Sequence, residues 1–129
     1  MKTLDKLVIC FLISLFTSCD SSDNLGNDFY VNYVDVESNR NIYYKDQGIF
    51  KSLHVNFVCY NDDKILVRGY PEHLDRTIDT TKFEYYIIDK SVYSINPIQM
   101  ESNGNIGPIG IGQFEIEKVN LFNAKSLSW

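Results

Sequence analysis

The sequence is poor in the residues on which catalytic and metal sites most often depend. Its 129 residues include only three cysteines and two histidines. It contains no H-E-x-x-H, G-x-S-x-G or C-x-x-C pattern, so the common zinc-protease, serine-hydrolase and dithiol signatures are absent. His54 and His73 are too few for a zinc site, because such a site needs three or four converging ligands. We therefore expect no metal, no cofactor and no catalytic residues.

Clustered positive charge and a membrane-spanning apolar run are missing as well. The net charge is −5 and the basic residues are scattered, which argues against nucleic acid because phosphate-binding faces need clustered Lys and Arg. The apolar run Leu7–Phe16 is about half of the roughly 20 residues that a membrane-spanning helix needs. It follows Lys2 and Lys6 and ends in small residues. This order predicts a secretory signal peptide over residues 1–18.

The residues that end this leader predict a lipid anchor. The run Leu15-Phe16-Thr17-Ser18-Cys19 resembles the lipobox of bacterial lipoproteins, although Phe16 stands where Leu is usual. The resemblance implies cleavage before Cys19 and acylation of that cysteine with chains such as palmitate. Each buried CH₂ contributes about 0.8 kcal/mol to membrane attachment. Ordinary secretory cleavage fits these residues less well, so we expect a protein attached to a membrane of a bacterial cell envelope through Cys19.

The polar stretch that follows predicts a lipidated tether over residues 19–27 and a single domain over residues 28–129. Asp20, directly after the cysteine, resembles the pattern of inner-membrane lipoproteins in enteric bacteria. Acidic residues at this place also resemble a surface-export signal of Bacteroidota-like bacteria. The two conventions disagree, so the inner and the outer membrane both stay open. A domain of about 100 residues suits one small core.

The composition of the domain predicts a mainly β fold of the α+β class. Short runs rich in Tyr, Phe, Val and Ile alternate with Asn, Asp and Gly, which is typical of strands and turns. Strands are expected over residues 28–36, 41–46, 53–60, 64–70, 83–88 and 92–96. A helix is expected over Gln113–Asn123, after a mobile glycine-rich loop at 101–112, although alternation at Phe114 and Ile116 also permits a strand. The predicted architecture is an antiparallel meander of about six strands with one C-terminal helix.

A first hairpin follows from the turn sequence Asn61-Asp62-Asp63. A three-residue loop there pairs Tyr60 with Lys64. This register places Phe57 and Cys59 on the core face. A lone cysteine there is typically a small buried side chain rather than a reactive thiol. Shifting the register by one residue would mix the two faces, which burial disfavours. A second hairpin is expected to turn at Asp89-Lys90-Ser91, with Ile88 opposite Val92.

The opposite face of the first hairpin is the candidate binding face. His54 is expected beside Tyr70, and Asn56 beside Arg68. Tyrosine and arginine with apolar neighbours are typical of binding hot spots. The alternative is an ordinary second face that other strands or the helix partly cover. The sequence thus predicts His54, Asn56, Arg68 and Tyr70 as the binding residues.

The C-terminal half resembles small bacterial lipoproteins of uncharacterised function. The similarity is carried by the Tyr-rich strand Phe83–Tyr93 and by Gly107-Pro-Ile-Gly followed by Phe114, although the loop before Gly107 is longer here. The resemblance implies a strand pair and then a short helix, and it brings no catalytic residues. Together with the missing motifs it favours a non-enzymatic binding domain, such as an immunity or inhibitor protein with a protein partner. The alternative is an accessory structural subunit of an envelope or surface complex.

Overall fold

Two antiparallel sheets and a flanking helix make up residues 23–95 and 108–129, the part of the chain that the computed structural model describes. Sheet A contains, in spatial order, β1 (Asp23–Gly26), β2 (Phe29–Tyr33), β3 (Arg40–Tyr44) and β4 (Gln47–Gly48). Sheet B contains, in the same sense, β7 (Glu84–Asp89), β6 (Lys64–Pro71), β5 (Leu53–Tyr60) and β8 (Lys125–Ser128). Helix α2 (Lys90–Ile95) follows β7, and α4 (Ile111–Asn120) precedes β8. The mainly β, α+β fold class with a C-terminal helix is confirmed.

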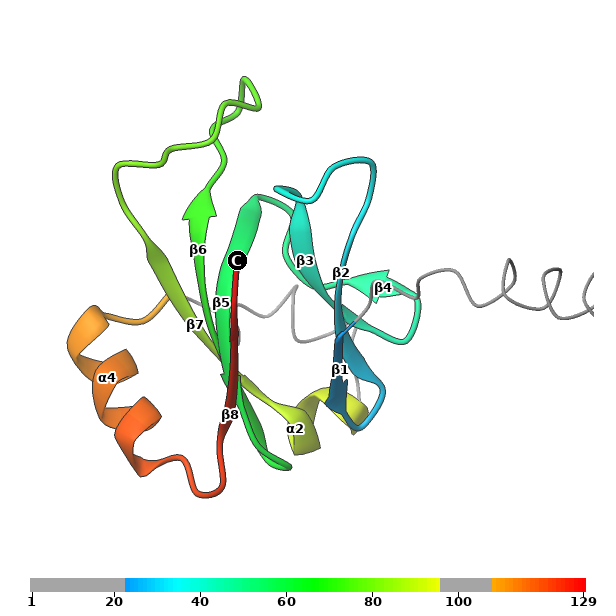
Figure 1. The fold of residues 1–129 in the computed structure, drawn as a ribbon, viewed down its shortest axis with the longest axis vertical. Coiled ribbons are helices and arrows are strands. Elements are labelled where there is room, and N and C mark those ends of the chain that lie inside the picture. The colour runs from blue at the N-terminus through cyan, green and yellow to red at the C-terminus, as the bar shows by residue number, and fades with distance from the viewer. Residues whose placement is uncertain (1–22, 96–107) are drawn as a thin grey trace, which may run out of the picture.

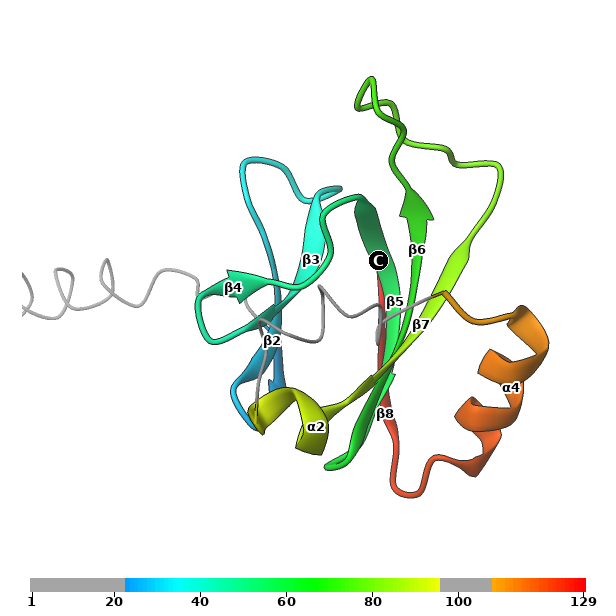
Figure 2. The same cartoon turned by 180° about the vertical axis from the view of Figure 1, so that it is seen from behind.

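The elements form three layers, with sheet B in the middle (Figures 1 and 2). Sheet A packs on one face of sheet B, and α4 lies on the other. The strands expected in one meander are therefore divided between two sheets. The last strand, β8, returns to pair with β5. A central sheet must carry apolar side chains on both faces. A binding face on sheet B is therefore limited to the area that neither sheet A nor α4 covers.

The larger core fills the space between the two sheets. Its most deeply buried members are Leu25, Phe29, Val31, Ile42, Val58, Ile65, Val67 and Ile88. Phe29 and Val31 are alternate residues of β2, so the period of two directs one face of sheet A inward. Burying one side chain of this size contributes about 1.5–3 kcal/mol. This layer is the main source of stability.

The first strand shortens the predicted tether. β1 pairs with β2 through a two-residue turn at Asn27 and Asp28, whose φ angles are 54° and 67°. Asn and Asp tolerate this left-handed conformation better than other non-glycine residues. Leu25 of β1 is buried in the core. Residues 23–26 therefore belong to the folded domain, which begins earlier than the predicted residue 28.

A β-bulge interrupts β5 in its middle. The register shifts between Val55 and Phe57, so Asn56 is the extra residue. Before the bulge, His54 pairs with Tyr70 as the sequence predicts. A bulge leaves one residue unpaired and changes which face the following side chains occupy.

Beyond the bulge the register predicted from the sequence is wrong by one residue. Tyr60 pairs with Ile65 instead of Lys64, and Phe57 pairs with Arg68. In a regular strand this shift would place core residues of one strand beside surface residues of the other. The bulge at Asn56 prevents this, because it reverses which face the later side chains of β5 occupy. Phe57 consequently packs against the outer core of sheet B instead of the core between the sheets.

A smaller core lies between sheet B and α4. Its buried members are Cys59, Leu66 and Phe114. Phe114 is the buried residue of α4, and its ring centroid lies 4.8 Å from that of Tyr85. The helix predicted over Gln113–Asn123 forms over Ile111–Asn120. Phe122, expected beside Phe114 on the buried face, follows the helix and is 79% exposed.

Helix α2 replaces the second predicted hairpin. Asp89 accepts the backbone N–H of Ser91 at 3.0 Å and the Ser91 hydroxyl at 2.6 Å, as a helix N-cap does. The side chain of Lys90 is buried, whereas the tip of a hairpin would expose it. The pairing of Ile88 with Val92 is therefore wrong, and the strand expected there is the helix that Asp89 caps.

Some predictions fall on other parts of the chain. The signal peptide, Cys19 with the start of the tether, and most of the loop at 101–112 lie outside the described residues. Within them, the strands β1, β4 and β8 were not predicted from the sequence. Each of these is short and has at most one apolar residue, so none carries the alternation by which strands are recognised.

Candidate binding surface

The four predicted binding residues lie on β5 and β6, but His54 does not share a site with the others. It is 8% exposed. Its Nδ1 lies 3.0 Å from the Ser38 carbonyl oxygen, and its Nε2 lies 2.6 Å from a Glu72 carboxylate oxygen. A carbonyl oxygen can only accept, so Nδ1 donates to it. His54 fastens the β2–β3 connection to the end of β6, and both ring nitrogens are occupied.

Asn56 and Arg68 do come together. The Arg68 Nε donates to the side-chain oxygen of Asn56 at 3.0 Å. The guanidinium carbon lies 5.1 Å from the ring centroid of Phe57 and 4.5 Å from that of Phe83. Both distances are within the range of cation–π attraction. The guanidinium is thus held by the hydrogen bond to Asn56 and by two rings, Phe57 on β5 and Phe83 just before β7.

Tyr70 extends this cluster toward the end of β6. Its ring stacks on Phe83 with centroids 4.9 Å apart and an interplanar angle of 27°. Phe83 is 38% exposed, whereas Asn56, Phe57, Arg68 and Tyr70 are half-buried. We call these five residues the Arg68 surface. Phe57 also makes an edge contact with Phe114 of α4, so this surface borders the outer core.

In the part of the chain that the structure describes, no carboxylate lies within ion-pair distance of Arg68. Among residues 23–95 and 108–129, no ion pair involves Arg68, and its one hydrogen bond is made through Nε. Within the same residues every fully buried side-chain nitrogen has a partner. The two Nη groups are therefore reached by solvent. They present N–H donors in a fixed plane, which suits carboxylate recognition.

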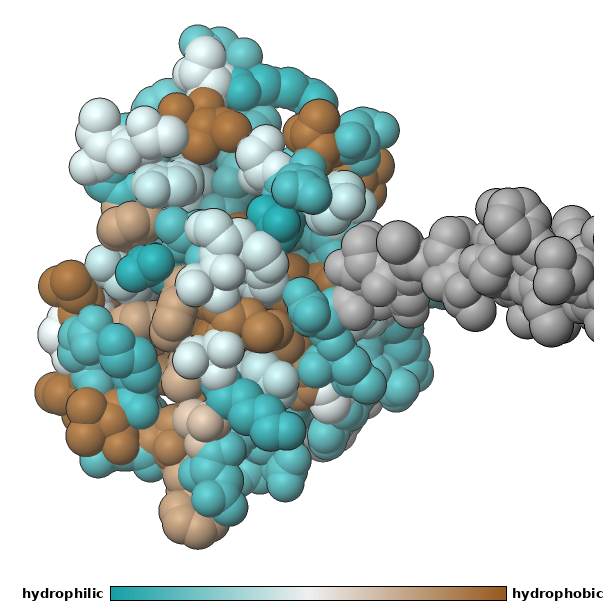
Figure 3. Space-filling model, in the orientation of Figure 1, coloured by the Kyte–Doolittle hydropathy of each residue, from teal (hydrophilic) through white to brown (hydrophobic). Residues whose placement is uncertain are grey.

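Apolar side chains on α4 and just beyond it are also exposed. Figure 3 shows them gathered over the helix at the lower left of the molecule. Ile116, Val119 and Phe122 are each more than half exposed. Their spacing of three residues places them along one side of the helix and its continuation. Nearby, Lys118 Nζ lies 5.7 Å from the Phe57 ring and 3.0 Å from a Glu115 oxygen.

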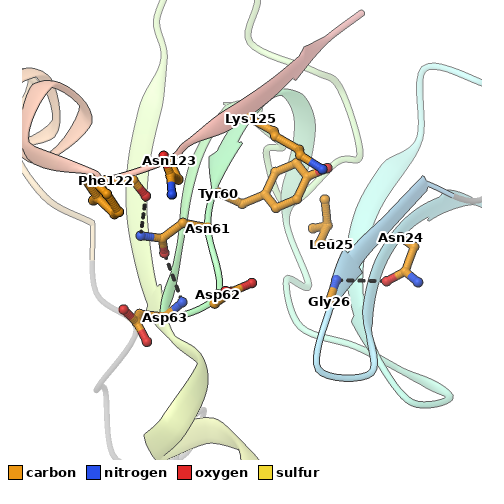
Figure 4. A pocket seen from close by; sticks show the side chains of 10 residues that line it. All are labelled: Asn24, Leu25, Gly26, Tyr60, Asn61, Asp62, Asp63, Phe122, Asn123 and Lys125. Atoms are coloured by element: carbon orange, nitrogen blue, oxygen red, sulfur yellow. Dashed lines mark hydrogen bonds between the residues drawn. The ribbon is translucent and has the colours of Figure 1, made fainter.

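A separate hollow of about 450 Å³ opens between the two sheets (Figure 4). Its lining comprises Asn24, Leu25, Gly26, Tyr60, Asn61, Asp62, Asp63, Phe122, Asn123 and Lys125. Asn61 is central, because its side chain accepts the Asp63 N–H at 2.9 Å and donates to the Phe122 carbonyl at 3.1 Å. These bonds hold the β5–β6 turn against the segment that leads into β8. The walls carry amides, the carboxylates of Asp62 and Asp63, and the ammonium of Lys125. Within the described residues no ion pair joins Lys125 to either carboxylate.

Lys90 joins the two sheets beside this hollow. Its Nζ donates to the Leu25 carbonyl of β1 and, at 2.6 Å, to the Asn61 carbonyl of the β5–β6 turn. The side chain is 1% exposed. Burial lowers the pKa of Lys90, and the nearby carboxylates of Asp62 and Asp63 oppose this shift. With no access from solvent, Lys90 is a structural cross-link and not a nucleophile.

No protein-family model, no curated protein and no solved structure matches the chain. The likeness of the C-terminal half to small lipoproteins therefore stays a prediction from the sequence. Cys59 is buried, and burial raises the pKa of its thiol, which disfavours the reactive thiolate. In the described ranges no three His, Cys, Asp or Glu side chains gather as metal ligands would. No helix of this part of the chain is long and apolar enough to cross a bilayer.

Two residues of the Arg68 surface, Phe57 and Phe83, were not proposed from the sequence. The expected alternation assigned Phe57 to the core face with Cys59, and the bulge at Asn56 carries no sequence signal of its own. Phe83 lies just before β7 and reaches Arg68 across the sheet. Such a contact depends on the twist and register of three strands, which a single sequence does not specify.

Proposed function

We propose that this chain is a lipid-anchored, non-enzymatic binding protein of a bacterial cell envelope, with an immunity or inhibitor protein as its most concrete form. The anchor is Cys19, supported by the lipobox-like end of the leader. The resemblance to small lipoproteins supports the same assignment. In this proposal the domain that begins at Asp23 lies close to the membrane, because the few residues between Cys19 and β1 reach at most about 3.5 Å each.

The Arg68 surface is the observation that carries the binding role. It combines arginine and tyrosine, which are enriched in hot spots, with phenylalanine, which is enriched in protein interfaces. Its arginine is already oriented by Asn56 and two rings. A side chain fixed before binding loses less entropy when a partner arrives. α4 covers the neighbouring part of the same face, so the surface is a limited patch on the outer side of sheet B and suits a protein partner.

Replacing the anchoring cysteine tests the attachment. Cys19→Ser is expected to abolish incorporation of labelled palmitate and to move the protein out of the membrane fraction or leave it unprocessed. Cys10→Ser is the matched control, because this residue leaves with the signal peptide and its loss leaves labelling unchanged. Normal labelling of Cys19→Ser would reject the lipid anchor.

Replacing an exposed ring tests the binding surface. Phe83→Ala in the full-length lipidated protein is expected to reduce capture of an envelope partner at least tenfold, which corresponds to about 1.4 kcal/mol or more. Phe122→Ala is the control, because it removes an equally large and even more exposed ring elsewhere. Equal losses in both variants, or no loss in either, would reject the assignment of binding to the Arg68 surface.

A further inference from the structure

We infer that the partner presents a carboxylate, from an aspartate or glutamate side chain, to the guanidinium of Arg68. This inference rests on the proposed binding function and adds the chemistry of its partner. The guanidinium offers two Nη groups to solvent, while its Nε is already bonded to Asn56. An Arg–carboxylate pair can form through two parallel N–H···O bonds, which add orientation as well as energy.

The described surroundings of Arg68 leave its two Nη groups free and fix the orientation of the guanidinium plane. Asn56 takes the Nε–H, so rotation about the last side-chain bond would break a hydrogen bond. Phe57 and Phe83 restrict the plane from the sides of β5 and β7. A carboxylate that approaches the two Nη groups meets donors that need no reorganisation. An arginine also loses less solvation than a lysine when a partner covers it.

The chain's own carboxylates around sheet B have partners other than Arg68. Glu72 and Glu84 lie on the side that faces sheet A, where they line a hollow with Phe50. Glu72 lies 2.6 Å from the His54 ring, and Glu84 accepts the Tyr86 hydroxyl at 2.6 Å. Glu115 pairs with Lys118 at 3.0 Å. None of these described carboxylates forms an ion pair with Arg68, so a partner carboxylate would supply a counter-charge that the fold has not provided.

The remaining features favour a protein carboxylate over a polyanion. The chain carries a net charge of −5, which repels a nucleic acid or another extended anion. The guanidinium is framed by Phe57, Phe83 and the stacked Tyr70, and aromatic surroundings of this kind suit the apolar contacts of a protein interface. A single guanidinium surrounded by aromatic rings is suited to bind a single acidic side chain on a protein surface.

The experiment compares capture by five versions of the full-length lipidated protein in detergent. The bait proteins are wild type, Arg68→Gln, Arg68→Lys, Phe83→Ala and Lys45→Gln, and the probe is the solubilised envelope protein of the producing cells. The probe is used untreated, after carbodiimide coupling of its carboxyl groups to ethanolamine, and after phosphatase treatment. Lys45→Gln is the matched control, because Lys45 is an exposed cation 5.4 Å from the Tyr44 ring on sheet A.

We expect Arg68→Gln to reduce capture at least tenfold, and Arg68→Lys to reduce it less because it keeps the charge but loses the fork. Lys45→Gln should capture as wild type does, and carboxyl coupling should abolish capture by all baits.

Capture that survives coupling but is lost after phosphatase treatment would replace the carboxylate with a phosphate. Capture that Phe83→Ala weakens and Arg68→Gln does not would reject the carboxylate while the binding surface stands. Absence of any captured protein would reject both.

Discussion

The two faces of sheet B use the same strands but are covered differently. On the inner face, the core shared with sheet A takes side chains from β5, β6 and β7, and most of its members are almost completely buried. On the outer face, α4 covers the part around Phe114, and the part around Arg68 stays open to solvent. The inner face therefore carries most of the folding free energy, and the outer face has room for recognition. The predictions below test this division, from the largest expected effect to the smallest.

The inner face should tolerate truncation least. Phe29 is fully buried between the sheets, and its ring lies 4.7 Å from that of Tyr44. Phe29→Ala is expected to lower the free energy of unfolding by about 3–5 kcal/mol, because it removes apolar contacts and leaves a cavity. Denaturant unfolding followed by far-UV circular dichroism measures this. A loss below about 1 kcal/mol would show that the inter-sheet core is not the main source of stability.

The outer core should respond more locally. Phe114→Ala removes the buried residue of α4, and we expect a loss of about 2–3 kcal/mol, because α4 can detach before the sheets separate. Hydrogen exchange should accelerate in residues 111–120 and stay slow in β5 and β6. Equal acceleration in both regions would show instead that the two faces unfold as one unit.

Lys90→Met tests the polar contact that closes the inner layer. The variant leaves the Leu25 and Asn61 carbonyls without their donor, and we expect a loss of about 2 kcal/mol at neutral pH. Burial lowers the pKa of Lys90 in the folded state, so the unfolded chain binds the proton more tightly. Wild-type stability therefore rises relative to the variant as the pH increases from this lowered pKa toward the usual value of 10.5.

Unfolding of both proteins in urea between pH 7 and pH 10.5 measures the difference, and effects of other groups cancel in the comparison. A difference that shrinks with rising pH would contradict the assignment of a lowered pKa.

Arg68→Gln should have the smallest effect on folding. Its contacts are half-exposed and its Nη groups are unpaired within the described residues, so we expect a change within about 1 kcal/mol. Thermal unfolding measures it beside the capture experiment. A loss as large as that of Phe114→Ala would make Arg68 a structural residue and remove the contrast between the two faces.

The sequence predicts those elements whose apolar residues carry their own signal. The strands around Leu53–Tyr60 and Lys64–Pro71 have enough Val, Ile and Leu to be placed almost to the residue. Asp89-Lys90-Ser91 was misassigned because an aspartate before a serine is equally suited to a turn and to a helix N-cap. What decided between them was the buried ammonium of Lys90, whose partners are 29 and 65 residues away in the chain.

The candidate site was predicted only in part, because the predicted register of the first hairpin holds only up to the bulge at Asn56. Asn56 and Arg68 were placed side by side because the register is correct up to the bulge. Phe57 was placed on the wrong face because the register changes at the next residue. Close packing also contributes here: a Cβ on Gly69 would lie 2.6 Å from the His54 carbonyl oxygen, so β6 approaches β5 closely only because this residue is glycine.

The bond between Lys90 and β1 acquires a mechanical meaning in an anchored protein. If the chain is anchored through Cys19 as proposed, a pull between membrane and domain would enter the described part of the fold at Asp23, in the edge strand β1 of sheet A. A short edge strand can be peeled away one hydrogen bond at a time. The Nζ of Lys90 donates a hydrogen bond to the carbonyl of Leu25, two residues after Asp23, and another to the Asn61 carbonyl of the β5–β6 turn. Through these two bonds, β1 is also connected to sheet B. In an anchored protein, the force needed to detach β1 would then depend on Lys90 as well as on the pairing of β1 with β2.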